Sequence, residues 1–314
     1  MTGAPVPDAL PVLSEKRNLI VVLGPTASGK TRLAVQLAEQ LGGEIISADS
    51  RQVYRGLDIG SGKDLHEYGQ IPYHLIDIVD PGHEFNLFEY QRDFFKAYEG
   101  IQSRHKLPLL VGGSGLYLDA VLNGYRLVKV AENPTLRQQL ATLSHEELVQ
   151  RLQNSRSKLH NRTDLEDRSR LIRAIEIAEG QAEARDRLPS LPALYPILFG
   201  LRFSRRDLRK RITERLKARL DEGMIEEVRE LLVRGLPFET LEFYGLEYRY
   251  AAQFIRGVLN RNDMFQKLNS AIHQFAKRQE TWFRRMERNG AIIHWLDGRE
   301  DPFNQAMSVL GESG

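Results

Sequence analysis

The chain alternates short apolar runs with longer stretches in which apolar residues recur every three or four positions. The run 19–23 is rich in β-branched residues and ends at a glycine, which is typical of a buried parallel strand. Segment 31–41 then places leucines and alanines at helical spacing and stops at two glycines. Strand patterns at 44–48 and 108–111, with a helical pattern at 88–104 between them, repeat this order. Alternating strands and helices predict a parallel sheet covered by helices.

The pattern changes between residues 123 and 181. The sequence there is polar and strongly helical, with little strand signal. This segment predicts a small helical insertion domain, with helices at 136–143, 146–154 and 167–180.

The alternation resumes after the insertion. A strand pattern covers 195–203, helical patterns cover 204–234 and 246–282, and a late strand pattern lies at 291–296. We therefore predict one α/β core domain formed by 18–122 and 182–314, with the insertion domain at 123–181 and a flexible N-terminal tail at 1–17.

Composition narrows the possible chemistry. The 314 residues include no cysteine, which excludes a disulfide scaffold, a thiolate zinc site and a cysteine nucleophile. No stretch approaches the roughly 18 apolar residues that a membrane-spanning helix requires. Residues 1–17 also lack the continuous apolar run of a secretory signal. We expect a cytoplasmic protein that does not contact a membrane.

A phosphate-binding motif follows the first predicted strand and opens the first predicted helix. The sequence GPTASGKT fits the pattern G-x-x-x-x-G-K-[ST], in which backbone N–H groups, the helix N-terminus and the lysine surround phosphate oxygens. The threonine hydroxyl in this motif can hold Mg²⁺. The expected binding residues are Gly24, Pro25, Thr26, Ala27, Ser28, Gly29, Lys30 and Thr31. The motif predicts a P-loop NTPase-like parallel sheet flanked by helices.

The motif does not decide the reaction. A kinase would need a second strand that ends in an aspartate for the magnesium ion, yet the strand pattern at 107–111 ends at Gly112. Asp77 or Asp80 could supply this carboxylate, but both could equally be surface residues. A small-molecule kinase therefore stays an alternative.

Asp49 follows the strand pattern at 44–48. In open α/β sheets ligands bind at the carboxyl ends of the strands, so this carboxylate could accept a proton from a nucleophile or complete a metal site. It could equally cap a short turn, a position that Asp favours.

Several segments together resemble the tRNA dimethylallyltransferases, isopentenyl-transferring enzymes that modify an adenine beside the anticodon. The likeness extends over about residues 18–297. It is carried by GPTASGKT (24–31), SADSRQVYRGLDIGSGK (47–63), YHLIDIVDP (73–81), LPLLVGGSGLYLDAVL (107–122) and AKRQETWFRR (276–285).

The resemblance implies a catalytic centre. The phosphate loop would hold the diphosphate of dimethylallyl diphosphate through Lys30, with Mg²⁺ bound by Thr31. Asp49 would accept the proton from N6 of adenine-37 as it attacks the allylic carbon. Ser114 stands where the family usually has threonine and keeps the hydroxyl. Arg211 and Arg215, four residues apart on one predicted helix face, correspond to the family's diphosphate-binding arginines.

The resemblance also implies a tRNA surface for the anticodon stem-loop. Although the net charge is only +2, residues 200–219, 151–173 and 277–288 carry net charges of +7, +4 and +3, a segregation that suits a phosphate backbone. The insertion domain would clamp the anticodon stem. The tRNA-contacting residues implied are Asp49, Ser50, Arg51, Gln52, Tyr54, Arg137, Ser169, Arg170 and Arg173. Trp282 and Phe283, in contrast, have the helical spacing of core residues.

Two segments depart from the family pattern. Residues 244–249 replace its usual G-Y-[KR]-[EQ] element, and the acid-rich stretch 64–70 differs from the usual continuation. An adenylate isopentenyltransferase that uses free AMP or ATP, and a non-catalytic RNA-binding paralogue, stay alternatives. We expect a monomer.

Overall fold

The computed structural model describes residues 17–155, 167–183 and 190–311. The chain divides into two compact units, one formed by Met1–Asn123 with Pro192–Gly314 and the other by Gly124–Leu191. The second unit is the counterpart of the insertion expected at 123–181. The expected tail at 1–17 lies, apart from Arg17, outside the described residues.

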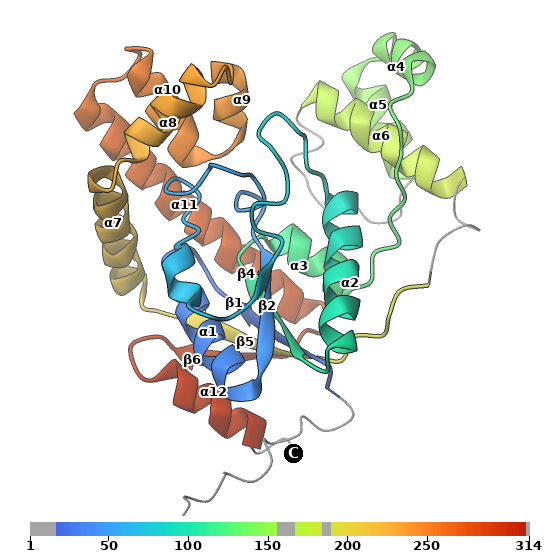
Figure 1. The fold of residues 1–314 in the computed structure, drawn as a ribbon. Coiled ribbons are helices and arrows are strands. Elements are labelled where there is room, and N and C mark those ends of the chain that lie inside the picture. The colour runs from blue at the N-terminus through green and yellow to red at the C-terminus, as the bar shows by residue number, and fades with distance from the viewer. Residues whose placement is uncertain (1–16, 156–166, 184–189, 312–314) are drawn as a thin grey trace, which may run out of the picture. The chain divides into compact units, whose positions relative to one another are not determined.

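The first unit contains a six-stranded parallel sheet with the strand order β3-β2-β4-β1-β5-β6 (Figure 1). The parallel sheet predicted from the sequence is therefore confirmed. The strands are β1 Leu19–Leu23, β2 Gly43–Ala48, β3 Tyr73–His74, β4 Leu107–Gly112, β5 Pro196–Arg202 and β6 Ile293–Asp297.

Helices cover both faces of the sheet. Helices α1 (Lys30–Leu41) and α12 (Pro302–Gly311) pack on one face, and α2 (Leu87–Ser103) packs against β2 and β4 on the other. Helix α3 (Gly115–Leu122) contacts α2, and α11 (Arg261–Arg288) contacts α3.

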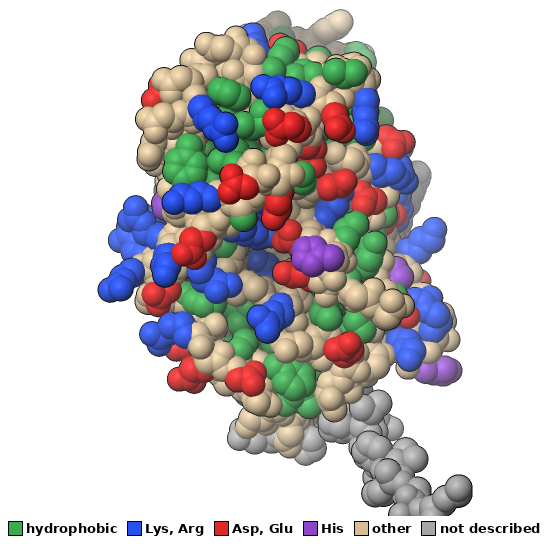
Figure 2. Space-filling model, turned by 60° about the vertical axis from the view of Figure 1, so that its left-hand side comes forward, with side chains coloured by type: hydrophobic (Ala, Val, Ile, Leu, Met, Phe, Trp, Pro, Cys, Tyr) green, Lys and Arg blue, Asp and Glu red, His purple; other side chains and the backbone are tan. Residues whose placement is uncertain are grey.

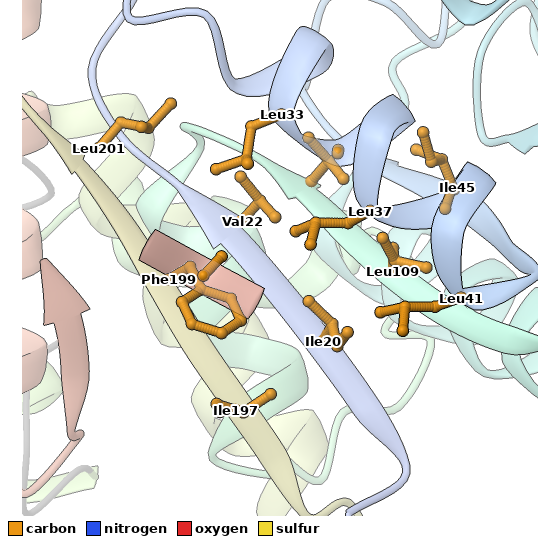
Figure 3. Close-up of a cluster of buried hydrophobic side chains, with 14 of the residues drawn as sticks. Ile20, Val22, Leu33, Leu37, Leu41, Ile45, Leu109, Ile197, Phe199 and Leu201 are labelled. Carbon is orange, nitrogen blue, oxygen red and sulfur yellow. The ribbon is translucent and has the colours of Figure 1, made fainter. Parts of the chain in front are cut away.

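The core beneath α1 follows from the helical spacing seen in the sequence. Leu33, Leu37 and Leu41 point from α1 toward Ile20 and Val22 of β1, and all of these side chains are buried (Figure 3). Burial of this apolar face holds α1 against the sheet, so the loop that precedes α1 is carried on a rigid support.

Two long helical predictions are each interrupted in the structure. Segment 204–234 forms α7 (Arg205–Asp221) and α8 (Met224–Val233), because Gly223 between them adopts a left-handed backbone with φ of 103°. Segment 246–282 contains α10 (Leu246–Ile255) and the start of α11, which Asn260 caps by accepting a hydrogen bond from the Asp263 N–H. Helix α9 (Phe238–Phe243) packs against α10.

The second unit is helical throughout its described residues. It contains α4 (Pro134–Ala141), α5 (His145–Ser155) and α6 (Arg168–Glu183). Its core is a separate cluster of buried side chains, namely Leu140, Leu148, Leu152, Leu171, Ile175 and Ala178. In neither unit is a helix, as far as the described residues extend, long and apolar enough to cross a membrane.

Candidate active site

Three loops leave the sheet at the same level. Leu23 at the end of β1 and Ala48 at the end of β2 both pair in register with Gly112 of β4. A side chain at Gly112 would lie 2.1 Å from the Ala48 carbonyl oxygen, so this close approach requires glycine. The phosphate loop (residues 24–31), Asp49 and the glycine loop (residues 112–115) therefore emerge next to one another.

The phosphate loop contains a buried donor that has no partner among the described residues. Helix α1 begins after Gly29, which has a φ of 86° and leaves the helix N-terminus without a side-chain cap. The Ser28 hydroxyl is buried and makes no hydrogen bond to any described residue. Because buried polar groups normally have partners, this arrangement fits an anionic ligand with several oxygen atoms.

Lys30 lies in this loop with its ammonium held close to the backbone. Its Nζ donates to the Pro25 carbonyl oxygen over 2.8 Å. Burial, followed by the positive charge of Arg215, lowers the pKa of Lys30 to about 8, and the negative charge of Asp49 opposes this shift. Lys30, Arg215 and Asp49 thus lie within electrostatic range of one another, as expected for a single site.

Asp49 forms the turn that was one of the roles considered from the sequence. Its Oδ1 accepts a hydrogen bond from the Arg51 N–H over 2.9 Å, which forms a turn, and its side chain is partly exposed. Among the described residues Oδ2 has no hydrogen-bond donor, so it is available to accept a proton. The next loop supports this position, since Ser114 Oγ accepts from the Ser50 N–H over 3.2 Å.

Gln279 on α11 connects two of these loops. Its Oε1 accepts from the Thr26 N–H over 2.8 Å, and its Nε2 donates to the Gly113 carbonyl oxygen over 3.0 Å. No separate role was predicted for Gln279, although it lies within the segment 276–285 that carries the family resemblance. The connecting role follows from the structure, because the Gln279 amide is buried and a buried amide requires hydrogen-bond partners.

Phe283 is a core residue, as predicted, whereas Trp282 is only partly buried. Trp282 packs against Gly115, where any side chain would lie 2.3 Å from the indole, and its Nε1 donates to Asp119 Oδ2 over 3.0 Å. Phe283 is completely buried. The burial of Phe283 leaves its ring unable to stack on a nucleic-acid base.

Helix α7 carries three arginines at intervals of one turn, and the first of them contacts the phosphate loop. Arg211 Nε donates to the Ala27 carbonyl oxygen over 2.8 Å. Arg215, one turn later, forms an ion pair with Asp64. Arg219, a further turn along, is buried near the Gly60 carbonyl, and burial lowers its pKa. The spacing predicted that Arg211 and Arg215 share a face but did not single out Arg219.

Two of the residues in loop 50–54 that were predicted to contact tRNA, Gln52 and Tyr54, are buried. Gln52 donates from Nε2 to the Gly62 carbonyl and accepts from Ser47 Oγ, each over 3.0 Å. Tyr54 is 2% exposed and packs on Tyr244, with ring centroids 4.5 Å apart. Their burial does not favour the direct RNA contacts expected from the sequence, because both side chains are occupied in holding the loop.

Comparisons with known proteins place the chain in a family. The IPP transferase model matches residues 52–286, and an isopentenyl transferase model matches residues 17–70. The chain belongs to the IPP transferase family. It is 65% identical over 293 residues to a protein of Geotalea daltonii named tRNA dimethylallyltransferase 1, a match that covers 93% of this chain and 95% of that protein.

Other members of the IPP transferase family are similar in sequence and structure. A Phocaeicola vulgatus protein named tRNA dimethylallyltransferase 2 is 52% identical over 94% of this chain and 98% of its own length. The crystal structure of a tRNA isopentenylpyrophosphate transferase from Bacillus halodurans matches with a TM-score of 0.69 and 32% identity, covering 94% of this chain and 95% of that one. The fold is therefore that of this transferase family.

The carboxylates that a kinase could use are already paired in this family member. Asp77 forms an ion pair with the buried Lys63, whose Nζ also lies 2.5 Å from Asp58. Asp80 pairs with Arg55 at the surface over 2.8 Å. Since both are occupied by basic side chains, neither supports the kinase alternative.

The residues of the phosphate loop fit a magnesium ion that is held mainly by its ligand. No group of three or more His, Asp or Glu side chains that could hold a metal occurs in the part of the chain that the structure describes. Thr31 does supply a hydroxyl, which lies beside Tyr68, and Asp49 lies within electrostatic range of Lys30. Because Mg²⁺ keeps several waters and is commonly bound by one or two protein groups and phosphate oxygens, this sparse set suits it.

The predicted tRNA-binding arginines of the second unit differ in their surroundings. Arg137 binds Glu176 through two hydrogen bonds of 2.9 Å, and Arg173 binds the same carboxylate over 3.1 Å. The Glu176 side chain is 1% exposed, so this cluster holds α4 and α6 together. Arg170 is exposed and forms no ion pair with a described residue, while Ser169 donates to Asp167.

Basic side chains are also unevenly distributed over the surface of the first unit. Figure 2 shows one face on which Lys and Arg side chains lie toward both edges, with acidic side chains between them. Helix α7 belongs to the segment 200–219, which carries the net charge of +7. Such a surface suits a polyanion.

Proposed function

We propose that this chain transfers a dimethylallyl group from dimethylallyl diphosphate to N6 of adenine-37, next to the anticodon of tRNA, giving N6-(dimethylallyl)adenosine and diphosphate. The observation that carries the proposal is the convergence of Lys30, Asp49 and Ser114 at one sheet edge in a member of the IPP transferase family. An aspartate beside a phosphate cradle suits a reaction in which an amine displaces a diphosphate.

The phosphate loop would bind the diphosphate of the donor. The N-terminus of α1, the Ser28 hydroxyl and the Lys30 ammonium all lie at this loop. Arg211, held against Ala27, adds positive charge. These groups stabilise the charge that develops on the leaving oxygen, which is the term that usually dominates such a reaction. Mg²⁺, when bound by Thr31 and the diphosphate oxygens, would neutralise further negative charge on the leaving group.

Asp49 would accept the proton of the nucleophile. In the transfer, the N6 amine of adenine forms a bond to C1 of the allyl group, the bond between C1 and the diphosphate oxygen breaks, and one N6 proton moves to Asp49. The exocyclic amine is a weak nucleophile, so removal of this proton during attack assists bond formation. The turn that fixes Oδ1 of Asp49 leaves Oδ2 for this task.

The tRNA would bind through backbone charges and unstacked loop bases. The target adenine must leave its stack to enter a site, as enzymes that act on bases generally require. Most of the predicted contacts are accessible: Ser169 and Arg170 are exposed, and Asp49, Ser50, Arg51, Arg137 and Arg173 are partly exposed. We propose that the protein acts as a monomer in the cytoplasm, where unmodified tRNA is available.

A direct assay tests the function. The protein is incubated with Mg²⁺, dimethylallyl diphosphate and unmodified tRNA, the RNA is digested, and the nucleosides are analysed by mass. We expect prenylated adenosine from tRNA and none from free AMP. Prenylation of AMP alone would instead identify an adenylate isopentenyltransferase. Binding of tRNA with no transfer to either acceptor would indicate the non-catalytic paralogue.

A further inference from the structure

The diphosphate site contains an acidic side chain that the proposed reaction does not use. Asp64 Oδ2 forms an ion pair with Nη2 of Arg215, and the two side chains are 30% and 33% exposed. Asp64 opens the acid-rich stretch 64–70, the segment that departs from the family pattern. An arginine expected to bind diphosphate is therefore already partly neutralised by a carboxylate of the same chain.

The backbone around Asp64 keeps this pair in place. Asp64 itself has a left-handed backbone with φ of 46°, and the short helix η1 (Leu65–Tyr68) begins directly after it. Tyr68 is 3% exposed and lies beside Thr31 of the phosphate loop. At Gly62 a side chain would lie 2.7 Å from Nη2 of Arg215. The segment 62–68 is thus packed against both α7 and the start of α1.

The guanidinium of Arg215 is engaged on one side alone. Nη2 contacts Asp64 and, over 3.5 Å, the Gly62 carbonyl oxygen. Its Nε and Nη1 form no hydrogen bond to any residue that the structure describes. The charge of Arg215 contributes to the lowered pKa of Lys30, so Arg215 acts on the phosphate loop while it is paired with Asp64.

We propose that Asp64 is a competing counter-ion in the diphosphate site, which weakens the binding of diphosphate by sharing Arg215 and by its own negative charge. The inference rests on the proposed function, because it requires that the phosphate loop binds a diphosphate. Two effects of the carboxylate act in the same direction. It competes with the ligand for the donors of Arg215, and it lowers the positive potential that attracts an anion. The consequence for the reaction is easier release of the diphosphate product.

Two substitutions separate this role from a positioning role. Asp64→Asn removes the charge, keeps an acceptor oxygen for Arg215, and suits the left-handed backbone better than most residues. Asp64→Gly also suits this backbone and removes the side chain altogether. If Asp64 served to position Arg215, Asp64→Gly would weaken diphosphate binding. A competing counter-ion predicts tighter binding for both variants.

The experiment is calorimetric titration of the purified full chain with inorganic pyrophosphate at a fixed excess of Mg²⁺. We expect Asp64→Asn and Asp64→Gly to lower the dissociation constant by about three- to tenfold, as for the loss of one partly exposed charge beside the ligand. Asp80→Asn is the matched control, since Asp80 forms a surface pair with Arg55, and it should leave the constant unchanged. In an Arg215→Gln background, Asp64→Asn should have a smaller effect, because the shared partner is absent.

The outcomes distinguish this inference from the function on which it rests. Pyrophosphate binding by the parent protein, with unchanged or weaker binding by both Asp64 variants, would overturn the counter-ion role alone. No pyrophosphate binding by the parent protein or any variant would overturn the diphosphate site itself, and the counter-ion role with it. Tighter binding by Asp64→Asn and by Asp80→Asn to the same degree would show a general charge effect and would also overturn the role.

Discussion

Gln279 accepts a hydrogen bond from the Thr26 N–H over 2.8 Å, although the two residues are 253 positions apart in the chain. The same side chain donates to the Gly113 carbonyl oxygen. A single amide on α11 therefore sets the separation of the phosphate loop and the glycine loop. Helix α11 thus helps to hold the two loops together at the sheet edge where the candidate active site lies.

We predict that Gln279→Ala weakens pyrophosphate binding. The substitution leaves the Thr26 N–H and the Gly113 carbonyl without their partner, which costs about 1–3 kcal/mol for each buried group, so we expect a loss of roughly tenfold or more in affinity and a lower melting temperature. Titration calorimetry and thermal unfolding measure the two effects. Gln266→Ala, on the exposed side of the same helix, should change neither, and equal effects from both variants would contradict the role of Gln279.

The lowered pKa of Lys30 predicts a pH limit for ligand binding. Lys30 is charged below a pKa of about 8 and neutral above it, so Mg²⁺-pyrophosphate affinity should fall above pH 8, by up to about tenfold per pH unit while the bound state stays protonated. Lys30→Arg keeps its positive charge across this pH range. Its affinity profile against pH therefore shows the effect of the ligand's own titration, which is subtracted from the profile of the parent protein. Identical profiles for the two proteins would exclude Lys30 as the titrating group.

The lowered pKa of Lys30 also predicts how the free energy of unfolding changes with pH. Between the folded pKa of about 8 and the unfolded value of 10.5, the unfolded chain binds more protons than the folded one. The contribution of Lys30 to the free energy of unfolding therefore rises with pH across this window. Denaturant titrations of the parent protein and of Lys30→Met, which cannot titrate, should differ in slope against pH between these values. Parallel slopes would contradict the lowered pKa.

Asp49→Asn should abolish transfer and leave tRNA affinity nearly unchanged. The asparagine oxygen can still accept the Arg51 N–H that fixes the turn, but the amide cannot take the N6 proton, so we expect a loss of about a hundredfold or more in the rate of transfer. Single-turnover assays and filter binding measure the two quantities. Asp49→Ala also removes the turn, and a tRNA affinity that falls in this variant alone would separate the structural role from the chemical one.

In the second unit, Arg170 and Arg173 should behave differently. Arg170→Ala should weaken tRNA binding and reduce the salt dependence by about one charge, with no change in stability. Arg173→Ala should destabilise the unit, because it leaves the buried Glu176 with fewer partners. Hydrogen exchange in α4 to α6 and binding titrations at several salt concentrations separate the two. An unchanged salt slope for Arg170→Ala would remove this residue from the interface.

Much of the site was predictable because it is built from local signals. The phosphate loop, Asp49 and the glycine loop each follow an apolar strand run, and in a parallel sheet the carboxyl ends of strands meet at one edge. Periodicity also placed Arg211 and Arg215 on one helix face. The positions of helix breaks were less predictable, since the left-handed backbone of Gly223 depends on the packing of the helices on either side.

The sequence by itself determined the parallel α/β class, the phosphate loop and the family, since strand runs, helical spacing and a contiguous motif are local properties. Only the tertiary structure decided that Gln279 joins two loops, that Arg137 and Arg173 share a buried carboxylate, and that Asp64 pairs with Arg215. Apart from the pair of Arg173 and Glu176, which are three residues apart on α6, these contacts join residues far apart in the chain. Such a contact depends on packing and on the hydrogen-bond or ion-pair partners that a buried polar group requires. Neither can be predicted from the hydrophobic periodicity of the sequence.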